Sequence, residues 1–143
     1  MNLDGHLIET SRFSSDSDVF KGVDYVKNVW GINFLNSYDG SVWNRIYRRE
    51  FLFEKNIFFP ENMYWEDFDH SLKTILFAGR IMSTKSSYYN YRVNPNSVMN
   101  TLNNNTNMIA LFDSTIRLGG MLVDFSEEIA DLDNEIAKKI AIS

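Results

Sequence analysis

The stretch WEDFDHSLKTILFAG (residues 65–79) predicts the best-defined helix of the chain. Four apolar side chains recur at helical spacing and would share one side: Phe68, Leu72, Ile75 and Leu76. Acidic residues crowd the first turn, where the helix dipole favours them: Glu66, Asp67 and Asp69. Gly79 stands where a left-handed C-cap would end the helix, and His70 is expected on its water-facing side. The stretch therefore favours an amphipathic helix with a defined start and end.

Apolar spacing on either side of this stretch predicts further helices and two short strands. The helices are expected over residues 18–30, 42–55, 108–124 and 127–141, and the strands over 81–84 and 88–93. Ser17 or Asp16 would cap the first helix and Ser126 the last, because their side chains can accept backbone N–H bonds. This pattern predicts a helix-dominated α/β or α+β fold with a few short strands.

The length of 143 residues fits one domain. Residues 1–17 form a polar lead-in, residues 18–100 the main region, and residues 101–143 add C-terminal helices to the same domain. Hydrophobic residues make up 44% and charged residues 23%, which excludes a disordered or collagen-like chain. With 0 cysteines, a disulfide framework and a zinc–thiolate site are excluded.

The formal net charge of −5 disfavours a protein that binds the phosphate backbone of a nucleic acid. The dense basic cluster of Arg45, Arg48 and Arg49 is more typical of a solvated helix face. No stretch approaches the ~20 apolar residues that a membrane span requires. We expect a cytoplasmic protein, with peripheral attachment at the inner face of a membrane as the alternative.

The acidic pair Glu66 and Asp67 is the first candidate for chemistry. Consecutive helical residues point in different directions, so one of the two is expected to face a cleft. A carboxylate at a helix N-terminus stays ionised, which suits a general base that takes a proton from a substrate hydroxyl. The alternative is purely structural, because acidic residues favour first turns for the same electrostatic reason.

Asp16-Ser17-Asp18 has the Asp-x-Asp form that can hold a divalent cation and a diphosphate. Metal-binding pairs of this kind follow an apolar strand, and residues 11–15 do not form one. A helix cap is therefore the better account. His6 and His70 lie far apart in sequence and have no partner at metal-ligand spacing.

The third candidate is the run from Tyr88 to Arg92, with Ser97 shortly after it. Aromatic faces beside Arg92 and Asn90 suit sugar rings and phosphate oxygens. The structural alternative is a Tyr-rich strand packed in the core.

Five segments of the chain occur in an order that is found in a known family. They are VWNRIYRREFL (42–52), IFFPE (57–61), the pair Glu66-Asp67, YYNYR (88–92) and Ser97. In this order they resemble the C-terminal, acceptor-side half of the family 2 glycosyltransferases of the GT-A fold. The resemblance covers residues 18–100, and Arg45 stands where the family usually has Lys, which changes the geometry of the cation and keeps its charge.

This resemblance implies an inverting transfer of a sugar from a nucleotide-diphosphate donor to a hydroxyl of a glycan or lipid-linked acceptor. Asp67 would be the general base, and Glu66 would support it or contact the acceptor. Trp43 and Asn44 would belong to the acceptor-side wall. Arg92 and Ser97 would lie near the donor diphosphate.

The family's N-terminal half holds the nucleotide and the Asp-x-Asp ligands of a manganese or magnesium ion, and residues 1–17 are too few to supply it. We therefore expect an acceptor-side fragment that binds no metal through its own residues and is inactive alone. Its face toward that half would be apolar, so we expect a homo-oligomer.

Two other classes of function stay open. The chain would be a non-catalytic helical interaction module if its Tyr/Trp-rich face binds a protein or glycan. Binding of a nucleic acid through residues 45–49 is disfavoured by the net charge.

Overall fold

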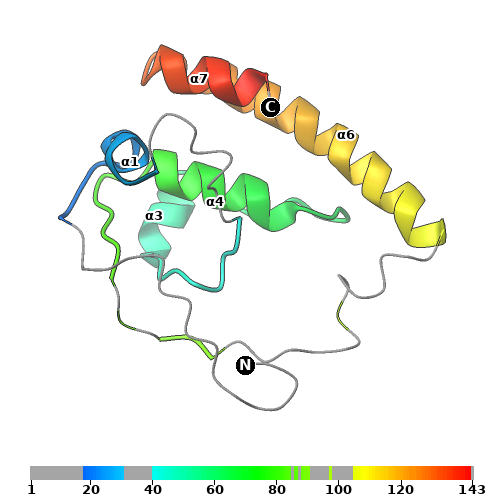
Figure 1. The fold of residues 1–143 in the computed structure, drawn as a ribbon, viewed down its shortest axis with the longest axis horizontal. Coiled ribbons are helices and arrows are strands. Elements are labelled where there is room, and N and C mark those ends of the chain that lie inside the picture. Colours follow the sequence, from blue (N-terminus) through cyan, green and yellow to red (C-terminus); the bar gives the residue numbers. More distant parts are fainter. Residues whose placement is uncertain are drawn as a thin grey trace.

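The computed structural model describes residues 18–30, 40–84, 86, 88–90, 97 and 105–142, with backbone alone at 29–30 and 105–107. Their regular structure is helical, as Figure 1 shows. A short helix, α1 (Gly22–Tyr25), runs directly into a π-helical turn, η1 (Val26–Trp30). The others are α3 (Arg49–Glu54), α4 (Glu66–Leu76), α6 (Asn105–Glu128) and α7 (Asn134–Ala141). The helix-dominated part of the predicted fold class is therefore confirmed.

The two predicted strands are not found in the described residues. Of residues 81–84, Ile81 alone pairs, forming an isolated antiparallel bridge with Phe20. Two backbone hydrogen bonds make this bridge, Phe20 N to Ile81 O at 2.9 Å and Ile81 N to Phe20 O at 2.8 Å. Residues 88–90 are irregular, and 91–93 lie outside the described part. A strand needs a neighbour along its whole length, and here the neighbouring chain turns into α1 after one residue.

The first helix begins later than its apolar spacing predicted. Lys21 occupies the N-cap position and makes no side-chain cap bond, and the predicted caps Asp16 and Ser17 lie outside the described residues. At the end of α4 the prediction of a left-handed C-cap at Gly79 is wrong. The helix ends at Phe77, whose backbone is right-handed (φ −84°, ψ −7°).

The predicted helix over 42–55 is wrong in its first half, because only Arg49–Glu54 are helical. The break between the helices predicted over 108–124 and 127–141 is also misplaced, because α6 continues to Glu128 and α7 begins at Asn134. Ser126 lies inside α6, and its Oγ donates to the carbonyl of Val123, 2.7 Å away, instead of capping a new helix. Asp133 caps α7, where its Oδ1 accepts from the backbone N–H groups of Glu135 (3.1 Å) and Ile136 (3.0 Å).

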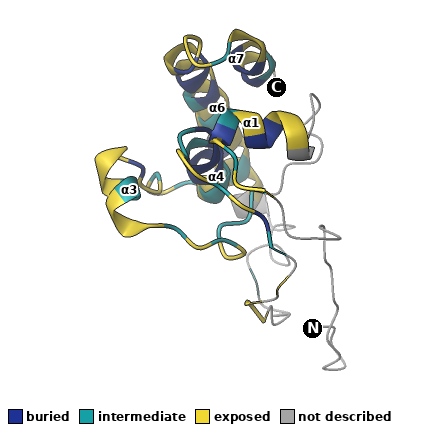
Figure 2. Ribbon diagram, turned by 90° about the vertical axis from the view of Figure 1, so that its left-hand side faces the viewer, coloured by how far each residue is buried: buried dark blue, intermediate teal, exposed yellow. Residues whose placement is uncertain are grey.

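Helix α4 lies at the centre, and the buried residues gather where α1, α6 and α7 meet around it (Figure 2). In this view α3 projects away from that core, and none of its residues is buried. The buried apolar side chains of the core come from five elements and the turn after α6: Tyr25, Val26, Leu72, Ile75, Leu76, Leu122, Phe125, Ile129, Ile136, Ala137 and Ile140. Burial of each large side chain contributes about 1.5–3 kcal/mol, so this cluster is the main source of stability.

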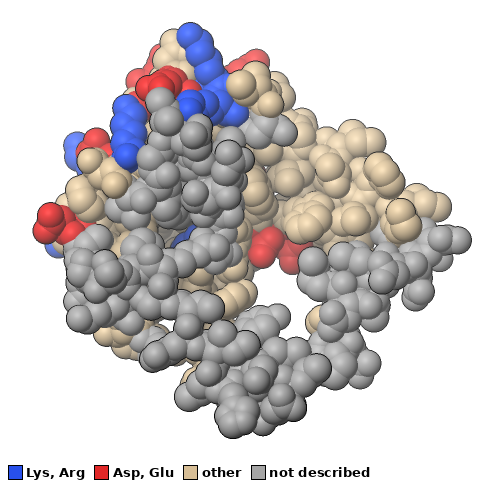
Figure 3. All heavy atoms as spheres, viewed as in Figure 1, with Lys and Arg blue, Asp and Glu red and all other residues tan. Residues whose placement is uncertain are grey.

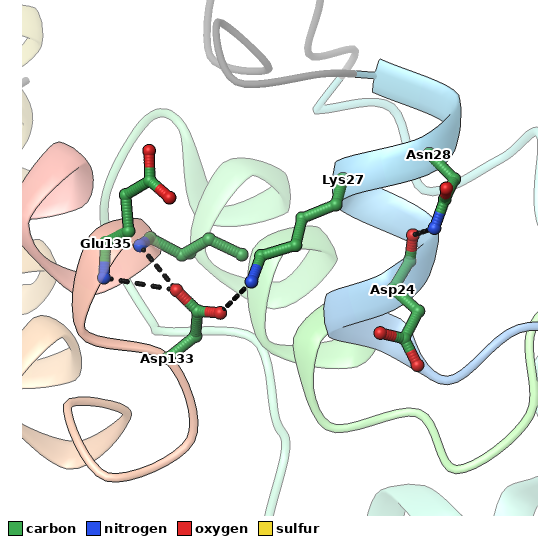
Figure 4. A network of polar contacts seen from close by, with 6 residues as sticks. Asp24, Lys27, Asn28, Asp133 and Glu135 are labelled. Atoms are coloured by element: carbon green, nitrogen blue, oxygen red, sulfur yellow. Dashed lines mark hydrogen bonds and ion pairs between the residues drawn. The ribbon is translucent and has the colours of Figure 1, made fainter.

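A network of polar contacts ties η1 to the corner between α6 and α7 (Figure 4). The Lys27 ammonium donates to Asp133 Oδ2, while Asp133 Oδ1 caps α7. This bond raises the pKa of Lys27 and lowers the pKa of Asp133. On the same helical turn Asn28 Nδ2 donates to the carbonyl of Asp24, 2.7 Å away. One carboxylate therefore stabilises both the start of α7 and its contact with the N-terminal helix.

Gly22 is the point of closest approach between α1 and α4. Its N–H donates to the carbonyl of Ala78 at 2.8 Å, and a Cβ at this position would lie 1.8 Å from the carbonyl oxygen of Ile75. Backbone atoms cannot move aside as a flexible side chain can. We predict that Gly22→Ala lowers the free energy of unfolding by about 3 kcal/mol or more, because α1 must lift away from α4.

Denaturant unfolding followed by circular dichroism measures this loss. Gly79→Ala is the matched control, because no atom lies within 4 Å of a Cβ there, and it should change stability by less than about 0.5 kcal/mol. Equal stability of the two variants would contradict the packing described.

Candidate functional site

Residues 40–47 pass along the N-terminal half of α4 and are fixed to it at several points. A Cβ at Gly40 would lie 3.4 Å from the Cα of Phe68. Ser71 Oγ donates to the carbonyl of Gly40 at 2.7 Å. The Arg45 guanidinium donates to Ser71 Oγ at 3.0 Å and to the carbonyl of Ser41. The segment that carries Trp43 and Asn44 therefore has a defined position against the helix that begins with Glu66 and Asp67.

His70 lies in an aromatic cage beside this segment. Its ring stacks on Phe59, with centroids 4.1 Å apart and planes 6° apart, and meets the Tyr47 ring edge-on at 5.5 Å. Only 3% of His70 is exposed, so its predicted place on the water-facing side is wrong. Helical spacing showed one apolar side of α4, but residues 40–47 and 57–60 cover a second side of it.

Burial lowers the pKa of His70. The charges of Arg45 and Lys73 lower this pKa further, and the Asp69 carboxylate partly opposes them. Asp69 Oδ2 accepts from Lys73 Nζ at 2.9 Å. Within the described part of the chain, three buried polar atoms around this cage have no hydrogen-bond partner: Tyr47 Oη, His70 Nδ1 and Asp69 Oδ1. Hydrogen-bonding capacity is thus left unused within the first turns of α4.

The predicted acidic pair opens α4, where Glu66 is exposed and Asp67 is half-buried. The residue before the pair, Trp65, has a left-handed backbone (φ 66°, ψ 21°), and its carbonyl accepts from the N–H of Phe68 at 3.0 Å. This conformation is unusual for a bulky residue and costs about 1–3 kcal/mol, and such strain gathers at functional sites. The sequence carries no signal for it, since left-handed positions are expected at Gly or Asn.

Trp43 and Tyr89 form a second feature of this side of the molecule. Their ring centroids lie 4.8 Å apart with planes 33° apart, and 43% of Trp43 and 49% of Tyr89 are exposed. Tyr88 and Asn44 are exposed as well. The contact joins the segment after Gly40 to the Tyr-rich segment, although 46 residues separate the two rings (89 − 43). The pair leaves aromatic surface open beside polar side chains.

The structure brings together only some of the residues singled out from the sequence. Trp43 and Asn44 lie on the segment packed against α4, and Tyr89 lies on Trp43. Ser97 is half-buried. Arg92 lies outside the residues that the structure describes. Of the basic cluster, Arg45 binds Ser71, Arg48 pairs with Glu50 at 3.6 Å, and Arg49 lies over the Phe53 ring at 4.7 Å.

Among the described residues, no group of three or more His, Cys, Asp or Glu side chains could hold a metal ion. Asp16 and Ser17 of the Asp-x-Asp motif lie outside the described residues, and no chemical step is routed through a manganese or magnesium ion. No helix in the described part is long and apolar enough to cross a membrane.

Comparisons of this chain with models of protein families, with curated proteins and with solved structures gave no significant match. Arguments about function therefore rest on the residues and their geometry. Two observations carry most weight, namely the strained start of α4 at its acidic pair and the open aromatic pair of Trp43 and Tyr89.

The buried histidine predicts a dependence of stability on pH. Because the pKa of His70 is lower in the folded protein than its ordinary 6.5, the unfolded chain binds a proton more readily. The free energy of unfolding should therefore be highest above pH 7 and fall as the pH decreases from 6.5 toward 5.5, by up to about 1.4 kcal/mol per pH unit.

Denaturant titrations at pH 7.5, 6.5 and 5.5 measure this slope. His70→Phe keeps an aromatic ring on Phe59 and removes the titrating group, so its slope in this range should be markedly smaller. The rest of the chain, His6 included, is the same in both proteins. An identical slope for the two would contradict a buried, neutral His70.

Proposed function

We propose that this chain contributes the acceptor side of a glycosyltransferase reaction. The observation that carries the proposal is the aromatic contact of Trp43 with Tyr89 beside the helix that begins with Glu66 and Asp67. Aromatic faces with neighbouring amide and hydroxyl groups suit sugar rings, which have apolar faces and polar edges. The order of motifs noted in the sequence supports the same assignment.

The acceptor would lie with a hydroxyl at Asp67 and a sugar ring near Trp43 and Tyr89. Asp67 takes the proton of that hydroxyl while the hydroxyl oxygen attacks the anomeric carbon of the donor sugar. The bond from that carbon to the nucleoside diphosphate breaks from the opposite side, so the configuration inverts and the diphosphate leaves with the electron pair. The positive end of the α4 dipole keeps Asp67 ionised before the transfer. Glu66, one residue earlier and exposed, would contact the acceptor in this proposal.

Arg92 and Ser97 would approach the donor diphosphate in this proposal, as the family resemblance implies. The nucleotide-sugar donor and any divalent metal would be held mainly by residues of a donor-binding half. The finer assignment, a GT-A-like fold, belongs to the same proposal.

A second candidate function is supported by the exposure of the aromatic side chains. With Trp43, Tyr88 and Tyr89 all exposed, a helical module that binds a protein or glycan without catalysis would use the same surface. Asp67 distinguishes the two candidates, because only the transferase needs its carboxylate for chemistry.

Ligand-induced stabilisation tests the acceptor-side assignment on the chain itself. We expect acceptor-type oligosaccharides to raise the Tm by several degrees at ~100 times their dissociation constant. Nucleotide-diphosphate sugars, with or without manganese, should not. Trp43→Ala and Tyr89→Ala should abolish the saccharide shift, whereas Phe53→Ala, which removes an exposed ring on α3, should keep it. A shift that requires both nucleotide and metal would place the donor site in this chain and contradict the proposal.

Loss of the Asp67 carboxylate tests the catalytic role. In a transfer assay in which the chain is supplied with a donor-binding half, Asp67→Asn should lower kcat about 10²- to 10⁴-fold, because the general base is lost. Its free energy of unfolding should fall by no more than about 1 kcal/mol. Glu50→Gln, an exposed acid on α3, is the matched control and should keep full activity. Saccharide binding with undiminished transfer in Asp67→Asn would favour the non-catalytic module.

A further inference from the structure

Helix α6 is apolar on two opposite sides. Its core side buries Leu122 and Phe125. On the other side Ile109 (74%), Phe112 (66%), Ile116 (74%) and Val123 (45%) are exposed. A helix turns by 100° per residue, so these four residues and Gly120 lie within about 40° of one line along the helix. We call these five residues the outer stripe. An apolar side of a helix is normally covered by other apolar groups, so the outer stripe is a surface that lacks its cover.

Two adjacent glycines lie within α6, although no close packing inside the described chain requires them there. Gly119 and Gly120 are helical, and no atom of the described chain lies within 4 Å of a Cβ built on either. Each glycine within a helix costs about 1 kcal/mol relative to alanine. The open space therefore suits a side chain that comes from outside the protomer.

The outer stripe is complementary to the outer stripe of a second copy that runs in the opposite direction. In an antiparallel pair of α6 helices related by a two-fold axis at Ile116, residue i faces residue 232 − i. Phe112 then faces Gly120 of the second copy, Ile109 faces Val123, and Ile116 faces its own equivalent. The largest side chain of the stripe thus meets the position without one, as close helix packing requires. A second copy of this chain is the occupant that this pattern describes.

Charges beside the stripe fit the same arrangement. Asp113 and Arg117 lie on one flank of the stripe, and an antiparallel pair brings like flanks together. Asp113 would be level with residue 119 of the second copy. Arg117 of that second copy lies two residues from this level, or about 3 Å along the helix axis, so the two opposite charges would lie close together. Arg117 is exposed and donates to the carbonyls of Asn62 (2.9 Å) and Glu61 (3.4 Å), which holds its guanidinium near this flank. In the space-filling view mainly uncharged side chains gather over α6 (Figure 3).

We propose that the chain forms an antiparallel dimer through the outer stripes of two α6 helices. The stripe runs over 15 residues and is about 21 Å long, which gives an interface at the small end of the specific range. The dimer is therefore reversible and visible at tens of micromolar. It stands apart from the proposed acceptor site, which lies on the N-terminal half of α4 and the segments packed there.

Sedimentation velocity of the full chain at tens of micromolar tests the dimer. Ile116→Glu places two carboxylates against each other at the two-fold axis and should raise the dissociation constant about 100-fold or more. Gly120→Leu fills the space for Phe112 and should also give a monomer, while its Tm rises because leucine is the better helix former. Ile142→Glu changes an isoleucine outside the stripe that is even more exposed (85%), and this variant should remain a dimer.

Cross-linking tests the orientation, because the chain has 0 cysteines of its own. A mixture of Ile109→Cys and Val123→Cys chains should give the mixed cross-linked dimer with a short bifunctional maleimide. Ile109→Cys alone should give none, since its two thiols would lie about 21 Å apart along the axis. Cross-linking of Ile109→Cys to itself would show a parallel pair and overturn the proposal. So would a wild-type monomer, which would assign the stripe to a different partner, or a dimer that Ile116→Glu leaves intact.

Discussion

The approach of α1 to the backbone of α4 at Gly22 is the constraint on which the rest of the molecule depends. Because Gly22 has no side chain, its N–H reaches the carbonyl of Ala78 and its Cα lies against Ile75. Tyr25 and Val26 can then pack on Leu72 and Leu76. The position of η1 also allows Lys27 to reach Asp133, so that the start of α7 is fixed by the same approach. With one face of α4 buried in this way, its N-terminal half is left to support residues 40–47 and the aromatic cage.

Local signals predicted α4 well, because several of them agree over one stretch. The apolar stripe, the acidic first turn and the length all point to the helix that is found, from Glu66 to Leu76. Residues 42–48 show the opposite case. Their apolar spacing favours a helix, yet Arg45 and Tyr47 are turned toward Ser71 and His70, and these tertiary contacts override the local preference. Spacing also could not choose between Ser126 and Asp133 as a cap, because a serine inside a helix can bond to the preceding turn.

The candidate site was predictable in its components and not in its geometry. Residue types and order pointed to Trp43, Asn44, Glu66 and Asp67. The burial of His70, the left-handed backbone of Trp65 and the contact of Trp43 with Tyr89 depend on segments that lie far apart in sequence. Helical periodicity describes a helix with a single buried side, so it could not predict that irregular chain covers a second side of α4. The β candidate over 81–84 failed for a related reason, because strand pairing depends on a neighbour that the segment itself does not specify.

Three features of this chain lower its stability, and no interaction among the described residues evidently compensates for them. Trp65 holds a strained backbone. The cage around His70 buries polar atoms that have no hydrogen-bond partner in the described part of the chain. In addition, α6 carries two adjacent glycines beside an exposed apolar stripe. Sequences otherwise tend to agree with their folds at every level, and departures from this agreement concentrate at functional sites. The first two features lie together at the start of α4, next to the acidic pair. The third lies on the far side of α6 from the core, so an interface formed there would leave the proposed acceptor site uncovered.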